Sequence, residues 1–348
     1  REFASSMTTL VTGATGFLGS HVTRQLVARG EKNVRVLARP SSDLRALAGL
    51  AVERVTGDLR DPSSLDAALA GVDLVFHVAA DYRLWARNPQ EIYESNVTGT
   101  RNLMDAARRA GVARIVYTST VATIAVSVAG SLPNERTEAR LADMIGAYKR
   151  SKFLAEQEVL KAAGEGLPVV IVNPTTPVGP GDWKPTPTGK IVVDFLNGRM
   201  PGYVDTGLNF VAVEDAAAGH LLAAERGKVG ERYLLGGENL SLHELLGGLA
   251  LVSGHPAPRF RVPIAIAFAA AYADAFVARL SGREPHIPID GVRIARHSMF
   301  VDCSKAARDL GFAPGPVAAA LGRAVRWYQD NGYVAEGRSE RLVRAHAA

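Results

Sequence analysis

The sequence predicts an α/β fold with a doubly wound parallel sheet, and three observations support this prediction. Short apolar runs alternate with amphipathic segments through the first half of the chain, as they do in strand–helix–strand units. Several runs are almost continuously apolar, which is typical of strands buried on both faces. A glycine-rich turn, Gly13–Gly19, lies between the first apolar run and the first amphipathic segment. Together these features indicate a Rossmann-type sheet with a smaller, mainly helical lobe in the second half of the chain.

The turn has glycines at every third position, in the pattern Gly-x-x-Gly-x-x-Gly. The first two glycines would leave no side chain between the backbone and a bound pyrophosphate, and the third would let the helix pack close to the strand. The phosphates would lie on free N–H groups at the helix N-terminus, where the helix dipole also favours them. The alternative is a purely structural glycine-rich turn. We assign the following residues to a dinucleotide site: Gly13, Thr15, Gly16, Phe17, Leu18 and Gly19.

The second predicted strand, Asn33–Ala38, ends at Arg39. In dinucleotide folds an acidic residue near this position binds the ribose 2′-hydroxyl of NAD. A guanidinium instead suits a 2′-phosphate, because its planar set of donors matches the phosphate oxygens. Arg39 therefore predicts NADP as the cofactor. NAD is the alternative, with Arg39 as an ordinary surface residue.

Two further pairs of residues follow predicted strands and are assigned to the cofactor. Asp58 and Leu59 follow the strand Val52–Val55; Asp58 could accept a hydrogen bond from the adenine amino group, or it could cap a turn. Ala79 and Ala80 end the next strand, and their small side chains would let the cofactor approach.

The loop after that strand leaves the sheet where ligands bind in such folds. Tyr82, Arg83 and Trp85 in this loop could line a substrate cleft, or they could simply pack locally. Asn96, on an otherwise apolar helical face within Glu91–Arg109, is expected to have a structural hydrogen-bonding role.

Three residues are candidates for catalysis. Tyr148 and Lys152 are spaced i and i+4 and therefore share one helical face, and Thr120 ends the strand that precedes that helix. A phenol normally keeps its proton up to about pH 10. A nearby ammonium and an oxidised nicotinamide ring would stabilise the phenolate, so Tyr148 could exchange a proton at neutral pH while hydride moves. Lys152 would also hold the nicotinamide ribose, and Thr120 would orient the substrate oxygen. The alternative is a surface Tyr and Lys beside a buried Thr.

The second half of the chain is expected to divide between two units. The dinucleotide-binding unit is predicted to span residues 7–180, with residues 208–236 returning to its sheet as strands Asn209–Asp215 and Glu231–Gly236. Asn173 and Pro174, which end the sixth strand, are added to the cofactor site. Residues 181–207 and 237–333 would form the substrate lobe, and residues 334–348 a loose tail. Residues 1–6 precede a methionine and are taken as residues added ahead of the natural start.

The segment Val262–Leu280 is nearly all apolar and about long enough to span a bilayer. Asp274 and Tyr272 interrupt it, and Pro263 starts it. We therefore predict no transmembrane segment but a core or cleft-lining helix, with a helix lying at a membrane interface as the alternative.

Composition excludes several other functions. The 348 residues carry a formal net charge of +5, but the charges are dispersed, which argues against a nucleic-acid partner. Cys303 is the only cysteine, so no disulfide forms within the chain and no cysteine-based zinc site exists. The histidines lack metal-ligand spacing, and His77 is expected to be a core residue. No secretory signal is visible, and a cytoplasmic location, with the protein peripheral to the membrane as a variant, fits this composition.

In order along the chain, these motifs resemble those of the extended short-chain dehydrogenase/reductases. The shared runs are Thr12–Gly19, Asp58-Leu59, His77–Ala80, Asn96–Thr100, Thr118–Thr120, and Tyr148 with Lys152. The chain is most similar to the hopanoid-associated sugar epimerase subfamily, which itself resembles dihydroflavonol 4-reductase. The runs that carry this similarity are Asp81–Ala86, Tyr148–Phe153, Lys184–Gly189 and Tyr203–Asn209. The resemblance implies a bacterial, cytoplasmic enzyme that modifies hopanoid lipids.

Two departures from the family pattern bear on the reaction. Thr120 stands where the family most often has serine, and it keeps the hydroxyl. Nucleotide-sugar epimerases usually place an arginine before the strand that here begins at Asn209, and this chain has Thr206-Gly207-Leu208 instead. A diphosphate without that cation is poorly held. We therefore expect an NADP(H)-dependent reductase of an apolar or lipid-linked substrate, with an NAD(P)-dependent sugar epimerase or dehydratase as the alternative.

A non-catalytic regulator is a third hypothesis, but such proteins commonly lose the Tyr or the Lys, and both remain here. The helices Glu91–Arg109 and Tyr148–Ala163 could form the four-helix seam of a homodimer.

Overall fold

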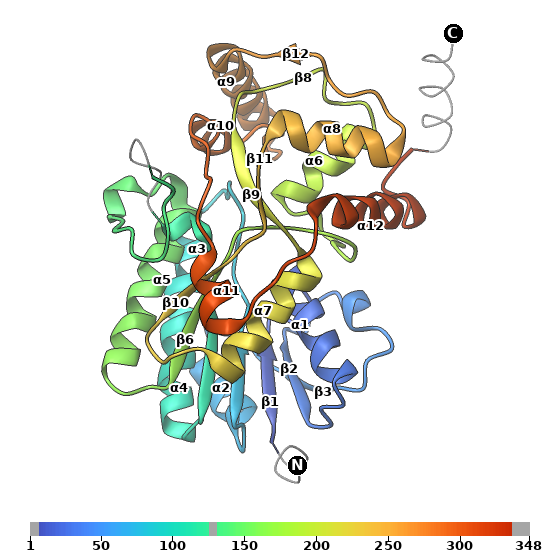
Figure 1. The fold of residues 1–348 in the computed structure, drawn as a ribbon. Coiled ribbons are helices and arrows are strands. Elements are labelled where there is room, and N and C mark those ends of the chain that lie inside the picture. Colours follow the sequence, from blue (N-terminus) through green and yellow to red (C-terminus); the bar gives the residue numbers. More distant parts are fainter. Residues whose placement is uncertain (1–6, 125–130, 336–348) are drawn as a thin grey trace.

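The computed structural model describes residues 7–124 and 131–335, and a seven-stranded parallel sheet forms its centre (Figure 1). The strand order is β10-β6-β5-β4-β1-β2-β3, which confirms the predicted doubly wound parallel sheet. The strands are β1 (Thr9–Thr12), β2 (Val34–Ala38), β3 (Glu53–Thr56), β4 (Leu74–His77), β5 (Arg114–Thr118), β6 (Val169–Pro174) and β10 (Arg232–Leu235). The order reverses between β1 and β4, and in such sheets ligands bind outside the carboxyl ends of the strands at this point.

Helices cover both faces of this sheet, so its strands are buried on both sides, as their continuous apolar character predicts. One face packs against α1 (Phe17–Ala28), α7 (Val213–Arg226) and α11 (Ser304–Leu310). The other face packs against α2 (Pro62–Leu69), α4 (Gly99–Ala110) and α5 (Gly146–Gly164). The helix before α4 comprises α3 (Gln90–Tyr93) and a π-helical turn, Glu94–Thr98. Short 3₁₀ turns occupy Arg45–Leu47, Val121–Thr123 and Leu141–Asp143.

A second region lies beyond the carboxyl ends of the strands (Figure 1). Its core joins a three-stranded sheet of order β11-β9-β7 to three helices. These elements are β7 (Thr176–Val178), β9 (Gly207–Ala212), β11 (Glu238–Ser241), α6 (Pro187–Leu196), α8 (Leu242–Ser253) and α12 (Val317–Asp330). A two-stranded sheet of β8 (Gly202–Tyr203) and β12 (Phe260–Arg261), together with α9 (Ile264–Ser281) and α10 (Ile289–Ile294), completes it.

Two sequence-based assignments in this half are wrong. The strand predicted at Asn209–Asp215 does not return to the main sheet, because β9 pairs with β7 and β11, and its last residues begin α7. Conversely, α11 lies within the predicted lobe segment, yet Ala306 and Leu310 pack into the core of the main sheet. An apolar strand pattern does not specify which sheet the strand joins. The predictions for residues 1–6 and for the tail beyond residue 335 lie outside the described residues.

Helix α9 also differs from the prediction. It is the one helix in the described ranges that is long and apolar enough to cross a membrane, and it is not a core helix. Only one side of it lines a cavity, through Ala275 and Ala278. Most of its side chains are exposed, and it lies at an outer edge of the second region (Figure 1). Hydropathy alone could not distinguish this placement from burial.

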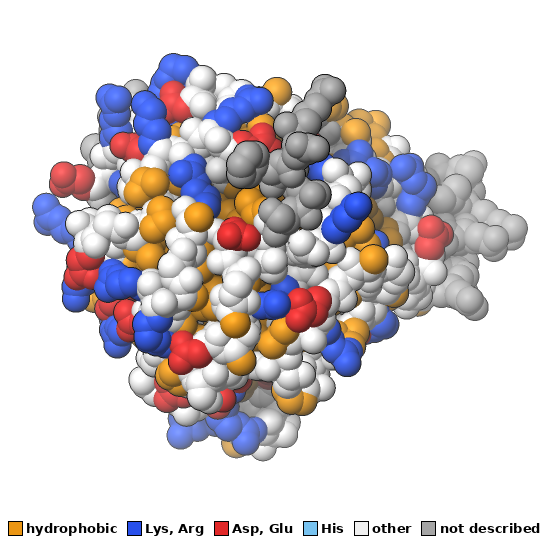
Figure 2. Space-filling view, turned by 90° about the horizontal axis from the view of Figure 1, so that it is seen from below, with side chains coloured by type: hydrophobic (Ala, Val, Ile, Leu, Met, Phe, Trp, Pro, Cys, Tyr) orange, Lys and Arg blue, Asp and Glu red, His pale blue; other side chains and the backbone are white. Residues whose placement is uncertain are grey.

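The opposite end of the molecule, at the amino ends of the strands, has a mixed surface (Figure 2). Lys and Arg are interspersed there with Asp and Glu, in keeping with the dispersed charge of the sequence.

Candidate active site

The glycine turn lies tightly against the neighbouring strand end. Gly13 has a φ of +73°, and a Cβ built on it would lie 2.6 Å from the backbone nitrogen of Ala79. A Cβ on Gly19 would lie 2.2 Å from the carbonyl oxygen of Gly13. No side chain fits at either position, so the strand, the turn and α1 can approach one another only because both residues are glycine.

The first turn of α1 suits an anionic group. Gly16 is the N-cap of α1 and is exposed, no side chain caps the helix, and its first turn contains no acidic residue. The N–H groups of this turn are therefore free for phosphate oxygens, and the helix dipole adds to the attraction. Thr15, Phe17 and Leu18 are only partly buried around this turn. The described residues thus fit the pyrophosphate of a dinucleotide.

The end of β2 presents a guanidinium, and the end of β3 presents a second. Arg39 is exposed, and its charge lowers the pKa of Asp58, although Arg60 has the larger effect. Arg60 binds the Asp58 carboxylate through two nitrogens, at 3.0 and 2.7 Å. Asp58 also accepts the backbone N–H of Arg60 at 2.9 Å, so it serves the turn, which was one of the two roles considered for it. The sequence analysis did not identify Arg60. The only indication in the sequence was its position two residues after Asp58.

Hydrogen bonds connect the strand end beside the glycine turn to α4. Thr12 Oγ1 accepts the backbone N–H of Ala79 at 3.3 Å and lies 2.8 Å from His77 Nδ1. His77 Nε2 lies 3.0 Å from Thr100 Oγ1. Burial, with a smaller effect from Lys152, lowers the pKa of His77 to about 3. His77 is therefore a neutral, hydrogen-bonded core residue, as predicted.

The three candidate catalytic residues lie at the carboxyl end of β5. Thr120 follows β5, and its side chain is hydrogen-bonded to that of Tyr148 in the first turn of α5. Lys152, one turn further along α5, donates to Tyr117 Oη at 3.0 Å and to the Thr118 carbonyl at 2.8 Å. The helix thus places the phenol beside the Thr120 hydroxyl and the ammonium behind it, against the strand.

Without the cofactor, the pKa of Tyr148 is not lowered by Lys152 as expected. Burial raises the pKa of Tyr148, and the hydrogen bond with Thr120 only partly opposes that rise. The Lys152 amine is directed to Tyr117 and Thr118 and not to the phenol, which explains the difference. Burial also lowers the pKa of Lys152 to about 7, with Glu156 opposing this effect. Tyr148 therefore carries its proton at neutral pH, as a general acid requires.

A buried carboxylate supports this site and was missed in the sequence. Glu156, on α5, accepts hydrogen bonds from Thr123 Oγ1 at 3.0 Å and from Asn173 Nδ2 at 2.9 Å, and also from Ser119 Oγ. Arg232 pairs with it at 3.2 Å. Its signal in the sequence was an acid one helical turn beyond Lys152, on a face that continues with Ala155, Val159 and Ala162.

Asn173 takes part in this network. Its amide nitrogen also donates to the carbonyl oxygen of Thr120 at 3.1 Å, and the residue is fully buried. The Asn173 side chain therefore holds the loop that carries Thr120, and its assignment as a cofactor contact stays a prediction, as does that of Pro174.

The loop after β4 is tied to α5. Asn96 donates from Nδ2 to the carbonyl of Asp81 and to Ser151 Oγ, both at 2.9 Å, which confirms its structural role. Arg83 pairs with Asp81 at 2.6 Å and with Glu91 at 3.1 Å, so its charge is engaged locally. Tyr82 and Trp85 remain the aromatic residues of this loop that could meet a substrate. The Tyr82 hydroxyl donates to the Lys184 carbonyl at 3.3 Å.

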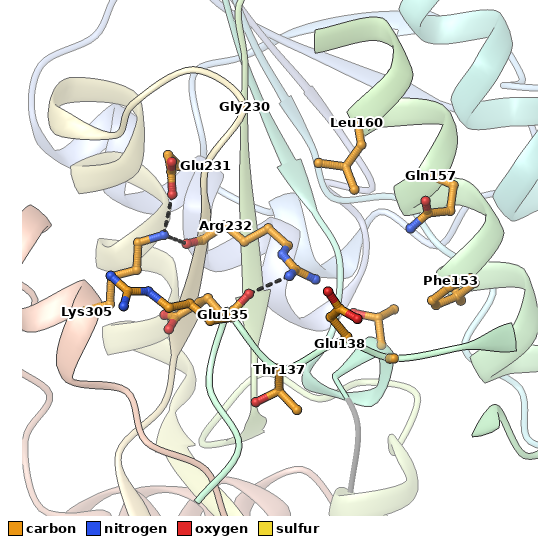
Figure 3. Close-up of a pocket in the computed structure, with 13 residues that line it drawn as sticks. Glu135, Thr137, Glu138, Phe153, Gln157, Leu160, Gly230, Glu231, Arg232 and Lys305 are labelled. Atoms are coloured by element: carbon orange, nitrogen blue, oxygen red, sulfur yellow. Dashed lines mark hydrogen bonds and ion pairs between the residues drawn. The ribbon is translucent and has the colours of Figure 1, made fainter. Parts of the chain in front are cut away.

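A cavity of about 600 Å³ between α5 and β10 lies outside this site (Figure 3). Two of its cations are engaged locally: Lys305 pairs with Glu231 at 2.6 Å, and Arg232 donates to the Glu135 backbone carbonyl. Within the described residues no group of His, Cys, Asp and Glu could hold a metal ion.

This fold and site define a class of enzyme: oxidoreductases of the extended short-chain dehydrogenase/reductase type. The chain belongs to the NAD dependent epimerase/dehydratase family, whose model matches residues 9–236. It is 46% identical to a dihydroflavonol 4-reductase-like protein of Synechocystis sp., covering 93% of this chain and 95% of the relative. It is 40% identical to sterol demethylase protein B of Methylococcus capsulatus, covering 94% of this chain and 100% of the relative.

Among solved structures, the chain is similar to PA4631, a nucleoside-diphosphate-sugar epimerase from Pseudomonas aeruginosa. The TM-score is 0.79 at 31% identity, with 95% of this chain and 100% of the other covered. The family is NAD(P)-dependent and acts on small molecules.

Proposed function

We propose that this enzyme is an NADP(H)-dependent reductase that transfers hydride to a carbonyl carbon of an apolar or lipid-linked substrate, or catalyses the reverse oxidation. The observation that carries the proposal is the contact between Thr120 and Tyr148, with Lys152 behind them on the same helix. Two donors converging on one point suit a substrate oxygen that gains a proton as its carbon gains hydride. The relatives named for reduction and for sterol demethylation support this class of substrate.

The cofactor would supply the hydride from its nicotinamide ring. The Gly13–Gly19 turn and the first turn of α1 would hold its pyrophosphate, and Arg39 with Arg60 would meet its 2′-phosphate. Thr120 would fix the substrate oxygen beside the phenol of Tyr148, and the Tyr148 O–H would give that oxygen its proton. Lys152 would hold the nicotinamide ribose and return the phenolate to its neutral form. The remaining assignments, Leu59, Ala79 and Ala80, stay predictions of contact with the cofactor.

Titration of the purified protein with NADPH and with NADH tests the cofactor assignment. We expect NADPH to bind at least tenfold more tightly, about 1.4 kcal/mol, because the guanidinium is matched to the extra phosphate. Arg39→Asp should abolish that preference, whereas Arg326→Asp, an exposed arginine on α12, should leave it intact. A preference for NADH in the unaltered protein would contradict the Arg39 assignment.

A sugar epimerase or dehydratase is the second candidate, favoured by the likeness to the nucleoside-diphosphate-sugar epimerase. The residues at the start of β9 argue against a sugar epimerase or dehydratase. Gly207 there lies against the ring of Phe300, where a Cβ would approach to 2.4 Å, and no arginine occupies Thr206–Leu208 to bind a sugar-nucleotide diphosphate. Net consumption of NADPH separates the two candidates, since an epimerase consumes none.

A cytoplasmic location and a homodimer through α4 and α5 remain predictions. The exposed sides of these helices carry the ion pairs Arg101–Glu158 and Arg108–Glu165, at 2.7 and 2.8 Å, so such a seam would have to accommodate charge.

A further inference from the structure

Helix α9 presents its larger apolar side chains to the outside. Ala271 and Ala278 are buried against the protein, whereas Phe276 is 65% exposed and Leu280 is 73% exposed. The bulky exposed residues of the helix are Ile266, Tyr272, Phe276, Val277 and Leu280. On a free surface the larger apolar groups would be expected to face inward. This reversed arrangement indicates that the outer face of α9 is covered by another apolar phase.

The strand before the helix extends this face. Phe260 on β12 is 75% exposed, and β12 pairs with β8 next to α9 (Figure 1). The exposed patch therefore comprises Phe260 and the five residues of α9 listed above. We refer to it as the α9 face. Large apolar side chains exposed together on one helix face are typical of an interaction site.

The segment that contains α9 carries a surplus of arginines. Residues 259–297 contain six arginines and no lysine, against only Asp274, Glu284 and Asp290 as acids. Two of the arginines are paired, Arg261 with Asp205 and Arg293 with Asp290. The other four form no ion pair with any residue in the described ranges: Arg259, Arg279, Arg283 and Arg296. This surplus contrasts with the mixed charges at the other end of the molecule (Figure 2).

A cavity lies on another side of α9, between this helix, the loop after β4 and α10. The cavity holds about 660 Å³ and is lined by Trp85 from the loop after β4, by Ala275 and Ala278 from α9, and by Asp290 from α10. Four arginines also line it: Arg87, Arg279, Arg283 and Arg293. Asp290 also lies against the start of α5, where a Cβ on Gly146 would approach its carboxylate to 2.6 Å. Tyr148 is two residues further along the same helix. A molecule in this cavity would thus lie between α9 and α10, beside the Asp290 side chain that packs against the start of α5.

We propose that the α9 face docks on the surface of an anionic lipid bilayer. The bulky apolar side chains would enter the boundary between headgroups and acyl chains, and the unpaired arginines would meet lipid phosphates. Tyr272 suits this boundary, because its ring is apolar and its hydroxyl is polar. The cavity beside α9 would then receive an apolar substrate from the bilayer. This last step rests on the proposed function, whereas the docking itself does not.

Vesicle flotation tests the docking. The full-length protein is mixed with vesicles of phosphatidylcholine alone or of equal parts phosphatidylcholine and phosphatidylglycerol. We expect binding to the mixed vesicles at least tenfold stronger than to phosphatidylcholine, and weaker binding at high salt. The double variant Phe276→Ser with Leu280→Ser should lose at least tenfold in binding. The matched control, Val229→Ser, removes an exposed apolar side chain elsewhere and should bind as the unaltered protein does.

Three results would overturn the proposal. They are no binding to the mixed vesicles, equal binding by the double variant, and a change from dimer to monomer in the double variant without any vesicle binding. The last result would show that a second copy of the chain covers α9. Thermal melting verifies that both variants fold. NADPH titration without vesicles separates the two proposals, because it reports the cofactor site of the proposed function and should not respond to the α9 substitutions.

Discussion

The carboxylate of Glu156 accepts a hydrogen bond from the amide nitrogen of Asn173 at 2.9 Å, and the same amide nitrogen donates to the carbonyl of Thr120 at 3.1 Å. A buried charge on α5 therefore holds the loop that carries one candidate catalytic residue. It also lies one helical turn from Lys152, whose pKa it raises against the effect of burial. Glu156 is thus a positioning residue with an electrostatic effect.

Glu156→Gln should lower both stability and activity. Loss of the charge leaves Arg232 without its partner, so we expect the free energy of unfolding to fall by about 2–3 kcal/mol. The pKa of Lys152 should also fall, because the neighbouring carboxylate no longer favours the ammonium. The alkaline limb of the pH–rate profile should therefore move to lower pH. A loss of stability with an unmoved pH profile would mean that Glu156 is purely structural. Glu158→Gln, on the exposed side of α5, is the control.

Gly13→Ala should destabilise the protein and impair dinucleotide binding. The positive φ and the overlap with Ala79 together cost about 2–5 kcal/mol. Gly30→Ala is the matched control: its φ is +87°, but a Cβ there meets nothing within 4 Å. That variant should lose only about 1–2 kcal/mol and bind NADPH normally. Thermal melting and NADPH titration check both. Equal effects would show that close approach at Gly13 is unimportant.

Lys152→Met should stabilise the protein most at low pH. The unfolded amine has a pKa near 10.5, whereas burial lowers that of the folded amine to about 7. Between pH 7 and pH 10.5 the Lys152 amine is protonated mainly in the unfolded state. The contribution of Lys152 to stability is therefore fully present above about pH 10.5 and is lost as the pH falls towards 7. The gain in melting temperature from Lys152→Met should therefore be larger at about pH 6 than at about pH 9. Lys161→Met, exposed on the same helix, should show no such trend. A gain in melting temperature that grows with pH would contradict the burial of the Lys152 amine.

Substitution of Thr120 should show that its hydroxyl serves both stability and activity. Thr120→Val removes the hydroxyl that contacts Tyr148 and that caps the turn after β5 by accepting the Ala122 N–H at 3.2 Å. We expect a loss of about 1 kcal/mol in stability and about 10²-fold in kcat. Thr120→Ser should restore both, because the hydroxyl is retained. Full activity in Thr120→Val would remove Thr120 from the site.

Local chemistry made some features predictable from the sequence. The glycine spacing reports the close approach of Gly13 and Gly19 directly, since no other residue fits there. The i, i+4 spacing places Tyr148 and Lys152 on one face of α5, because helix geometry is regular.

Features that depend on tertiary packing were not predictable. Long-range packing decides which sheet β9 joins and that Phe276 on α9 faces outward. Local hydropathy carries no information about either. The partners of Glu156 come from three separate segments of the chain, residues 119–123, 173 and 232, so no local pattern predicts them. The pKa of Tyr148 depends on where Lys152 directs its amine, which spacing does not specify.

The most direct test of the proposed reaction follows nicotinamide absorbance as protein loaded with NADPH is mixed with apolar ketones. Our account predicts that one NADPH is oxidised for each ketone reduced. Tyr148→Phe should slow this step by about 10²–10⁴-fold while binding NADPH normally. Tyr233→Phe, on the edge strand β10, should behave as the unaltered protein does. Substrate conversion without net oxidation of NADPH, or undiminished reduction by Tyr148→Phe, would contradict the account.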